Sequence, residues 1–103
     1  MRFEIFFSPV AAKDWRALKA NFRAQVRDAV EQYLRHNPTR TSKSRIKRLR
    51  GLAQPQYRLR VGDIRVFYDV TRDRVEILGI VHKDNASEWL GAMGELDEKS
   101  SPE

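Results

Sequence analysis

The chain has 103 residues, no cysteine, two histidines and a formal net charge of +6, and 41% of its residues are hydrophobic. This length suits one compact domain with a charged, solvated surface, and no apolar run reaches the roughly 20 residues that a membrane-spanning helix needs. We therefore expect a cytoplasmic protein with no disulfide, no metal site, no membrane contact and no small-molecule cofactor.

The positive charge is concentrated in one segment. Residues 40–65 carry nine cations and a single anion, Asp63, for a net charge of +8, whereas the other 77 residues carry eleven cations and thirteen anions. A localised basic segment favours a polyanion as partner, because phosphate neutralisation releases counterions and gives sequence-independent affinity. A merely solubilising surface is the alternative, although such surfaces usually mix both signs.

The predicted elements begin with a strand at residues 2–7, where apolar and polar residues alternate before two phenylalanines. Ser8 followed by Pro9 is typical of a helix start, since serine caps the first free N–H groups and proline tolerates the first turn. Apolar residues at helical spacing then predict two amphipathic helices, or one kinked helix, over about residues 9–36.

A β-hairpin is the clearest element of the sequence. It follows segment 39–56, which is polar and basic and for which we expect a long connection with at most one helical turn. Residues 57–61 and 64–68 both alternate with period two, and Gly62-Asp63 between them is a two-residue turn. This turn pairs position 61 with 64 and, counting outward, position 57 with 68.

Alternation then assigns the hairpin residues to two faces. The apolar face, predicted to pack on the helices, carries Tyr57, Leu59, Val61, Ile64, Val66 and Tyr68. The opposite face, which we call the arginine face, carries Arg58, Arg60, Arg65 and Phe67.

The remaining elements are a strand, a short helix and a tail. Residues 75–82 are apolar on both faces and predict a more central strand. Asn85 or Asp84 is placed to cap a short final helix that contains Trp89. Residues 94–103 are polar and predict a frayed tail, so residues 1–93 form the predicted domain. The fold class is α+β, with a small and mostly antiparallel sheet, an N-terminal helical hairpin and a short C-terminal helix.

The arginine face indicates phosphate binding. Arg60 and Arg65 are expected directly opposite each other, and like charges across a strand pair destabilise by up to about 1 kcal/mol. An anion between them explains this placement, since guanidinium groups bind phosphate oxygens in a bidentate manner. Phe67 offers a ring on which an unpaired base stacks. In the alternative interpretation, the arginines only extend into solvent.

His82 and Trp89 each have two interpretations. His82 and Lys83 end the strand at 75–82, and one of them is expected to border the arginine face. A histidine there can transfer protons near neutral pH, although a single strand histidine is more often structural. Trp89 is either an anchor of the last helix or a stacking platform.

Several strings of the chain resemble the RelE/ParE superfamily of bacterial toxins, specifically the RelE-type messenger-RNA endonucleases. The likeness covers about residues 2–90. The strings that carry it are Arg48–Leu52, Tyr57–Tyr68, Val75–Lys83 and the aromatic Trp89, together with Ala12–Leu18 of the predicted first helix. The resemblance implies a RelE-like fold of the microbial RNase type.

The resemblance also implies a reaction and residue roles. RelE-type toxins cut messenger RNA in the ribosomal A site without a metal, by attack of a 2′-hydroxyl on the adjacent phosphate. Arg58 and Arg60 match the two basic residues of the family's second strand, and Arg65 matches the arginine after the turn. The resemblance thereby makes these arginines catalytic, with His82 at a position where relatives often have a histidine.

Two positions depart from the family pattern. Lys83 stands where an arginine is common, and Trp89 stands near the usual C-terminal tyrosine. Both are candidates for the catalytic set that the resemblance implies.

The resemblance finally implies partners. These are the messenger, the ribosome with its 16S-type ribosomal RNA, and a cognate antitoxin that covers the basic surface or displaces the final helix. The basic residues expected to hold RNA are Lys43, Arg45, Lys47, Arg48 and Arg50. Two alternatives stay open: a ParE-type toxin that poisons DNA gyrase, and a non-catalytic RNA-binding module.

Overall fold

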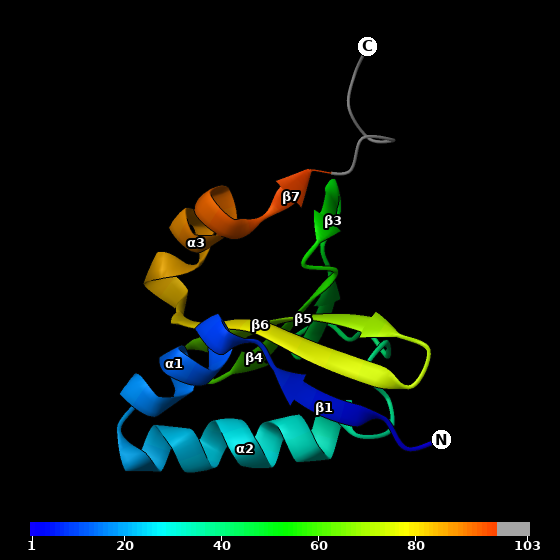
Figure 1. Ribbon diagram of the computed structural model, residues 1–103, viewed down its shortest axis with the longest axis horizontal. Coiled ribbons are helices and arrows are strands. Elements are labelled where there is room, and N and C mark those ends of the chain that lie inside the picture. The colour runs from blue at the N-terminus through cyan, green and yellow to red at the C-terminus, as the bar shows by residue number, and fades with distance from the viewer. Residues whose placement is uncertain (97–103) are drawn as a thin grey trace.

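The computed structural model describes residues 1–96 of the chain. In chain order, the elements are β1 (Glu4–Phe7), α1 (Pro9–Ala17), α2 (Ala20–Leu34), β2 (Ile46–Arg48), β3 (Leu52–Gln54), β4 (Tyr57–Val61), β5 (Ile64–Thr71), β6 (Arg74–His82), the short 3-10 helix η1 (Lys83–Asn85), α3 (Ala86–Met93) and β7 (Glu95–Leu96). Helices α1 and α2 lie on one side of the main sheet, and α3 with the β3–β7 ribbon lies on the other (Figure 1). None of the helices described is long and apolar enough to span a membrane.

The N-terminal helical hairpin forms as predicted, as two helices rather than one kinked helix. Ser8 has extended backbone, and its Oγ accepts a hydrogen bond from the N–H of Ala11 at 3.1 Å, while Pro9 occupies the first turn of α1. Leu18 and Lys19 also have extended backbone, so the chain turns between the two helices at these residues.

The main sheet has five strands in the order β1-β6-β5-β4-β2. β1 runs parallel to β6, and the other neighbours are antiparallel, so the α+β class with a mostly antiparallel sheet is confirmed. The β4–β5 register is the predicted one, from Val61 opposite Ile64 to Tyr57 opposite Tyr68. Gly62 in the turn has φ +59°, a left-handed conformation that glycine adopts without a Cβ clash.

The core lies between the sheet and the helical hairpin. Its fully buried side chains, each 0% exposed, come from both layers and include Leu59, Val66, Tyr68, Val75 and Ile77 of the sheet with Val26 and Leu34 of α2. The predicted packing of the apolar hairpin face on the helices is therefore confirmed. Tyr68 satisfies its hydroxyl by donating to the carbonyl of Pro38 at 2.7 Å, and burial raises the pKa of Tyr68 well above its ordinary value.

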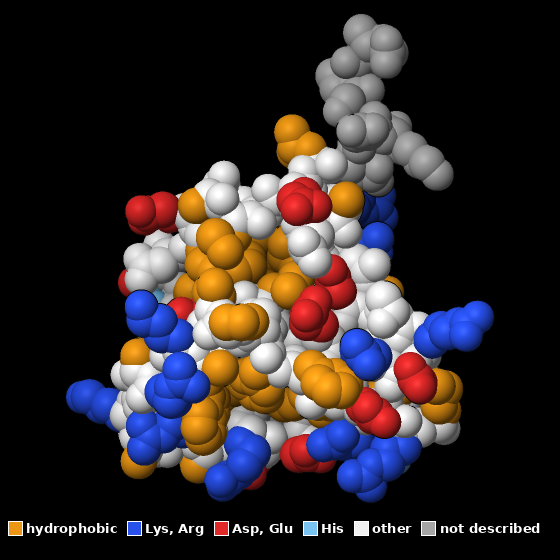
Figure 2. Space-filling model, viewed as in Figure 1, with side chains coloured by type: hydrophobic (Ala, Val, Ile, Leu, Met, Phe, Trp, Pro, Cys, Tyr) orange, Lys and Arg blue, Asp and Glu red, His pale blue; other side chains and the backbone are white. Residues whose placement is uncertain are grey.

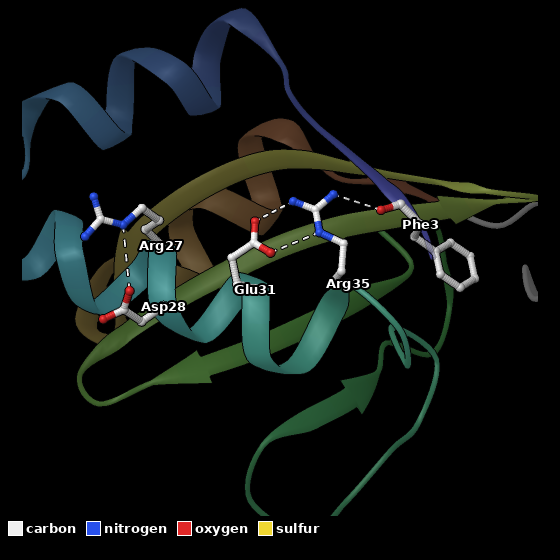
Figure 3. A network of polar contacts seen from close by, with 5 residues as sticks. All are labelled: Phe3, Arg27, Asp28, Glu31 and Arg35. Carbon is white, nitrogen blue, oxygen red and sulfur yellow. Dashed lines mark hydrogen bonds and ion pairs between the residues drawn. The ribbon is translucent and has the colours of Figure 1, made fainter. Parts of the chain in front are cut away.

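A polar network joins the end of α2 to the N-terminal segment (Figure 3). The guanidinium of Arg35 binds both carboxylate oxygens of Glu31, one helical turn earlier, and donates to the carbonyl of Phe3 at 2.9 Å. This hydrogen bond lowers the pKa of Glu31 and raises the pKa of Arg35. Arg27 and Asp28 form a separate, solvent-exposed ion pair. The network therefore ties the N-terminal segment to α2.

Two expectations from the sequence are wrong. Segment 39–56 is not a mere connection, because it contains β2 and β3. β2 adds to the free edge of β4 and buries Ile46, which is 3% exposed. The frayed tail predicted from residue 94 is contradicted at residues 95–96, which form β7 and pair with β3. The rest of that predicted tail, residues 97–103, lies outside the described residues.

Candidate nucleic-acid interface

Three guanidinium groups gather on the side of the β4–β5 hairpin that faces away from α1 and α2. Arg60 lies directly opposite Arg65, and Arg58 is two residues from Arg60 on the same side, opposite Phe67. Lys47 of β2 pairs with Arg58 and extends the row of cations. Among the described residues, none of the ion pairs includes an arginine of the arginine face. The predicted cluster is thus present, and no carboxylate of residues 1–96 pairs with it.

Arg58 is the member of this cluster with a buried polar atom. Its side chain is half-buried, and its Nε is buried without a hydrogen-bond partner among the residues described. Burial lowers the pKa of Arg58, and the positive charges of Arg65 and Arg60 lower it further. A buried donor without an acceptor costs about 1–3 kcal/mol, and more when the group is charged. An oxyanion bound among the three guanidinium groups would relieve the charge repulsion between them.

The β4–β5 turn orients a second arginine and a lysine. Arg65 Nη1 donates to the carbonyls of Gly62 at 2.8 Å and Ile64 at 3.2 Å, so its guanidinium is held over the turn. The Lys83 N–H donates to the Asp63 carbonyl at 2.7 Å, and Lys83 Nζ lies 3.5 Å from the Asp63 carboxylate. Of the two residues expected to border the arginine face, Lys83 is therefore the one held beside the turn that carries Arg65.

The prediction that Phe67 offers a free ring to a base is wrong. Phe67 is 1% exposed, because the indole of Trp89 lies parallel to it with 4.8 Å between ring centroids and 5° between planes. Gly79, opposite Phe67 on β6, makes room for the indole: a Cβ there would lie 2.2 Å from Trp89 Cζ2. Trp89 itself is half-buried. It acts as the anchor of α3, the first of its two interpretations, and a glycine within an apolar strand was the sequence signal for this close approach.

His82 lies on the other side of the sheet. The β5–β6 register places it opposite Ile64, a core residue, and it borders a cavity of about 430 Å³ together with Leu18 and Phe22 of the helical hairpin. Its Nδ1 accepts a hydrogen bond from the N–H of Asp84 at 3.2 Å, which starts η1. The structure therefore does not bring His82 together with the arginine face.

A second capping prediction concerns the last helix. Asn85 occupies the N-cap position of α3, but its side chain makes no capping hydrogen bond.

The described residues contain no group of three or more histidine, aspartate or glutamate side chains placed to hold a metal ion.

The basic residues of segment 40–50 fall into two groups. Arg40, Lys43, Lys47 and Arg50 are exposed and lie over no aromatic ring of the described residues. The half-buried Arg45 and the exposed Arg48 lie over tyrosine rings, at 4.7 Å from the ring centre of Tyr33 and 5.2 Å from that of Tyr57. Arg45 also donates to the carbonyl of Arg60, and Arg48 to that of Gln56. Cation–π contacts of this kind orient a guanidinium without neutralising it.

A group of hydrogen bonds around Asp69, which we call the polar clamp, lies beside the arginine face and was not predicted from the sequence. Asp69 of β5 accepts hydrogen bonds from the Gln54 side chain at 2.8 Å and from the Gln56 N–H at 2.7 Å, and the Gln56 side chain accepts from the N–H of Val70 at 2.9 Å. The clamp fixes the end of β3 against the sheet on the side of α3. An aspartate in a strand carries no sequence signal for such long-range partners.

Comparison with known proteins identifies the family. The sequence profile described as the ParE toxin of type II toxin–antitoxin systems (parDE) matches residues 5–86. Among solved structures, an arginine double mutant of the Escherichia coli toxin RelE in the free state is 26% identical with a TM-score of 0.66, covering 88% of this chain and 93% of that chain.

Two toxin–antitoxin complexes share the same fold. The RelBE2 complex of Mycobacterium tuberculosis is 24% identical, with a TM-score of 0.63 and coverage of 80% of this chain and 99% of that chain. The RelB–RelE complex of Methanococcus jannaschii is 21% identical, with a TM-score of 0.62 and coverage of 82% and 96%. No curated protein sequence matches the chain. The chain belongs to the ParE toxin family of type II toxin–antitoxin systems, within the RelE/ParE superfamily.

Proposed function

We propose that this toxin is an endoribonuclease that enters the ribosomal A site and cleaves the messenger bound there, which inhibits translation. The observation that carries the proposal is the arginine face, where Arg58, Arg60 and Arg65 stand together and, within residues 1–96, form no ion pair with a carboxylate. Repulsion between these like charges lowers the stability of the folded chain. Phosphate binding offsets this loss.

The chemistry follows from where negative charge develops. In the proposed step, the 2′-oxygen of one nucleotide attacks the adjacent phosphorus, its proton leaves, and the bond from phosphorus to the 5′-oxygen breaks as that oxygen gains a proton. The five-coordinate phosphate in between carries extra negative charge. The three guanidinium groups stabilise it in place of a metal ion, and removing one such preorganised donor typically costs about 10²–10³ in rate.

Lys83 and Trp89 have supporting roles in this proposal. Lys83, held beside the turn by Asp63, adds a fourth cation near Arg65. Trp89 has one ring face on Phe67 and is half-buried, so its outer edge is the aromatic surface left for a nucleobase. His82 receives no role at the phosphate, because it lies on the helix side of the sheet.

We propose two macromolecular partners besides the messenger. The exposed cations of residues 43–50 contact ribosomal RNA, which is a polyanion. A cognate antitoxin neutralises the toxin by covering the basic surface or displacing α3. The similar RelE chains of Mycobacterium tuberculosis and Methanococcus jannaschii, which were solved in complex with antitoxins, support this second partner.

A ParE-type action on DNA gyrase is the second candidate function. The description of the matching family profile favours it. It gives no account of the unpaired guanidinium cluster, however, and we therefore place it second.

Primer extension on a translated messenger separates these candidates. We expect ribosome-dependent cuts with the wild-type chain and none with Arg60→Ala or Arg65→Ala, while circular dichroism shows that both variants fold. Gyrase-linked DNA breaks without messenger cuts would establish the second candidate instead. Full cleavage by both single variants would contradict the proposed role of the arginine face.

A further inference from the structure

A polar recess lies at the edge of the sheet, beside β2. This recess, which we call the edge pocket, has a volume of about 320 Å³ and lies between the end of α2, the chain that leaves it, and β2. Six of its lining residues carry side chains suited to nucleotide binding: Gln32, Tyr33, Asn37, Arg40, Ser42 and Arg45. It is separate from the arginine face, and the functional proposal above does not use it.

A flat cationic platform forms one wall of the edge pocket. The guanidinium of Arg45 lies 4.7 Å from the ring centre of Tyr33, and its Nη1 donates to the carbonyl of Arg60 at 3.0 Å. Both contacts hold the guanidinium in a set orientation. Guanidinium planes and aromatic rings are the surfaces on which unpaired RNA bases stack in proteins.

Hydrogen-bonding groups surround this platform. Ser42 Oγ accepts from the N–H groups of Arg45 at 3.0 Å and Ile46 at 3.4 Å, so its hydroxyl hydrogen is available to donate. The amide side chains of Gln32 and Asn37 line the same space and present both donors and acceptors, the groups that read a base edge. The pocket therefore offers polar partners as well as a stacking surface.

One residue pair links the edge pocket to the strand that carries the arginine face. The Arg60 N–H donates to the Arg45 carbonyl at 2.8 Å, and the Arg45 guanidinium donates back to the Arg60 carbonyl. Arg40 is exposed at the pocket, and segment 40–50 carries six cations and no anion. A phosphate backbone that leaves the arginine face in this direction meets positive charge along its course.

We propose that the edge pocket binds one unpaired nucleotide of single-stranded RNA, whose backbone continues to the arginine face. The base stacks on the Arg45 guanidinium and Arg40 binds a phosphate of the same strand. This inference takes its ligand class from the proposed function and adds a binding site to it, yet its test needs no cleavage.

The first test measures binding of a fully 2′-O-methylated single-stranded RNA, which lacks the attacking hydroxyl. In fluorescence anisotropy we expect Arg40→Glu to weaken binding about tenfold or more and to lower the salt dependence by about one counterion. Lys13→Glu is the matched control, because it makes the same charge change at an exposed site on α1, which packs against β6 near the opposite edge of the sheet. We expect its effect to stay below about twofold, since screening limits distant charges. Equal weakening by both variants would overturn the site.

The second test locates the base. The same RNA with a single 4-thiouridine is cross-linked to the wild-type chain, and mass spectrometry maps the adduct. We expect adducts within residues 32–46 and weaker binding when an abasic nucleotide replaces the probe. Adducts only outside this range, or unchanged affinity of the abasic RNA, would overturn the nucleotide pocket.

The two proposals fail in different ways. Adducts in the edge pocket of a chain that shows no ribosome-dependent cleavage would overturn the endonuclease and support the pocket. Cleavage by a chain in which Arg40→Glu leaves RNA affinity unchanged would support the endonuclease and overturn the pocket.

Discussion

The two sides of the main sheet have opposite effects on the stability of the fold. On the side of α1 and α2, the hairpin residues are buried except for the half-buried Tyr57, and the hydroxyl of the fully buried Tyr68 donates to a carbonyl. On the other side, Arg60 faces Arg65, and the Nε of Arg58 is buried without a hydrogen-bond partner in the described part of the chain. The first side stabilises the fold, whereas the second side keeps charges that destabilise it in the absence of a ligand. The open side is for this reason the one to which the proposed function assigns RNA binding.

The largest expected effect tests the helix side. Leu59→Ala should lower the free energy of unfolding by about 2–5 kcal/mol, because Leu59 is 0% exposed and its truncation leaves a cavity. Urea denaturation of the two proteins measures this difference.

The matched control is a substitution of Arg60, the next residue along β4, whose side chain lies on the open side of the sheet. Arg60→Thr should leave stability unchanged or raise it by up to about 1 kcal/mol, since it removes a like charge opposite Arg65. A loss of stability in Arg60→Thr as large as that in Leu59→Ala would abolish the distinction between the two sides.

An intermediate effect is expected where α3 covers the open side. Gly79→Ala places a Cβ within 2.5 Å of two indole atoms of Trp89, so the indole must leave Phe67. We expect a loss of about 1–3 kcal/mol and a red shift of tryptophan emission, with faster hydrogen exchange confined to α3.

Gly91→Ala is the control for this change. A Cβ on Gly91, which lies within α3, meets no atom within 4 Å. This variant should gain up to about 1 kcal/mol of helix stability and keep the emission spectrum of the wild-type chain. The same red shift in both variants would show that Gly79 has no special role in seating Trp89.

The smallest expected effect concerns the buried tyrosine of the helix side. Tyr68→Phe should cost about 0.5–1.5 kcal/mol at neutral pH, through loss of the hydrogen bond to Pro38. The pKa of Tyr68 is raised in the folded state, so the folded protein holds the phenol proton more tightly than the unfolded chain does. This part of the stability is complete below the unfolded pKa of about 10 and declines as the pH rises above it.

The measurement is therefore a comparison of denaturation midpoints between pH 8 and about pH 11. The wild-type midpoint should fall more steeply with pH than that of Tyr68→Phe. Parallel slopes would show that burial of Tyr68 does not influence alkaline stability.

Much of this molecule was predictable because its signals are local. The Ser8-Pro9 start of α1 and the Gly62-Asp63 turn are read from neighbouring residues, and a two-residue turn sets the register of every pair in the β4–β5 hairpin. That register alone placed Arg58, Arg60 and Arg65 on one face.

The features that the sequence did not reveal depend on partners distant along the chain. β2 and β3 have little strand propensity, and they form because the edge of β4 and the residues of β7 supply hydrogen-bond partners. Phe67 was assigned to the correct face of the hairpin. Its burial depends on Trp89 of α3, which lies 22 residues later in the chain and covers the Phe67 ring.

The sequence by itself thus determined β1, the helical hairpin, the β4–β5 register, β6, α3 and the position of the positive charge, since short-range sterics and side-chain alternation govern these features. Only the tertiary structure decided which of these side chains are free to bind. It placed His82 on the helix side, covered Phe67 with Trp89, and set Arg45 between Tyr33 and Arg60. Burial and side-chain contacts come from packing between distant segments, which no local pattern encodes.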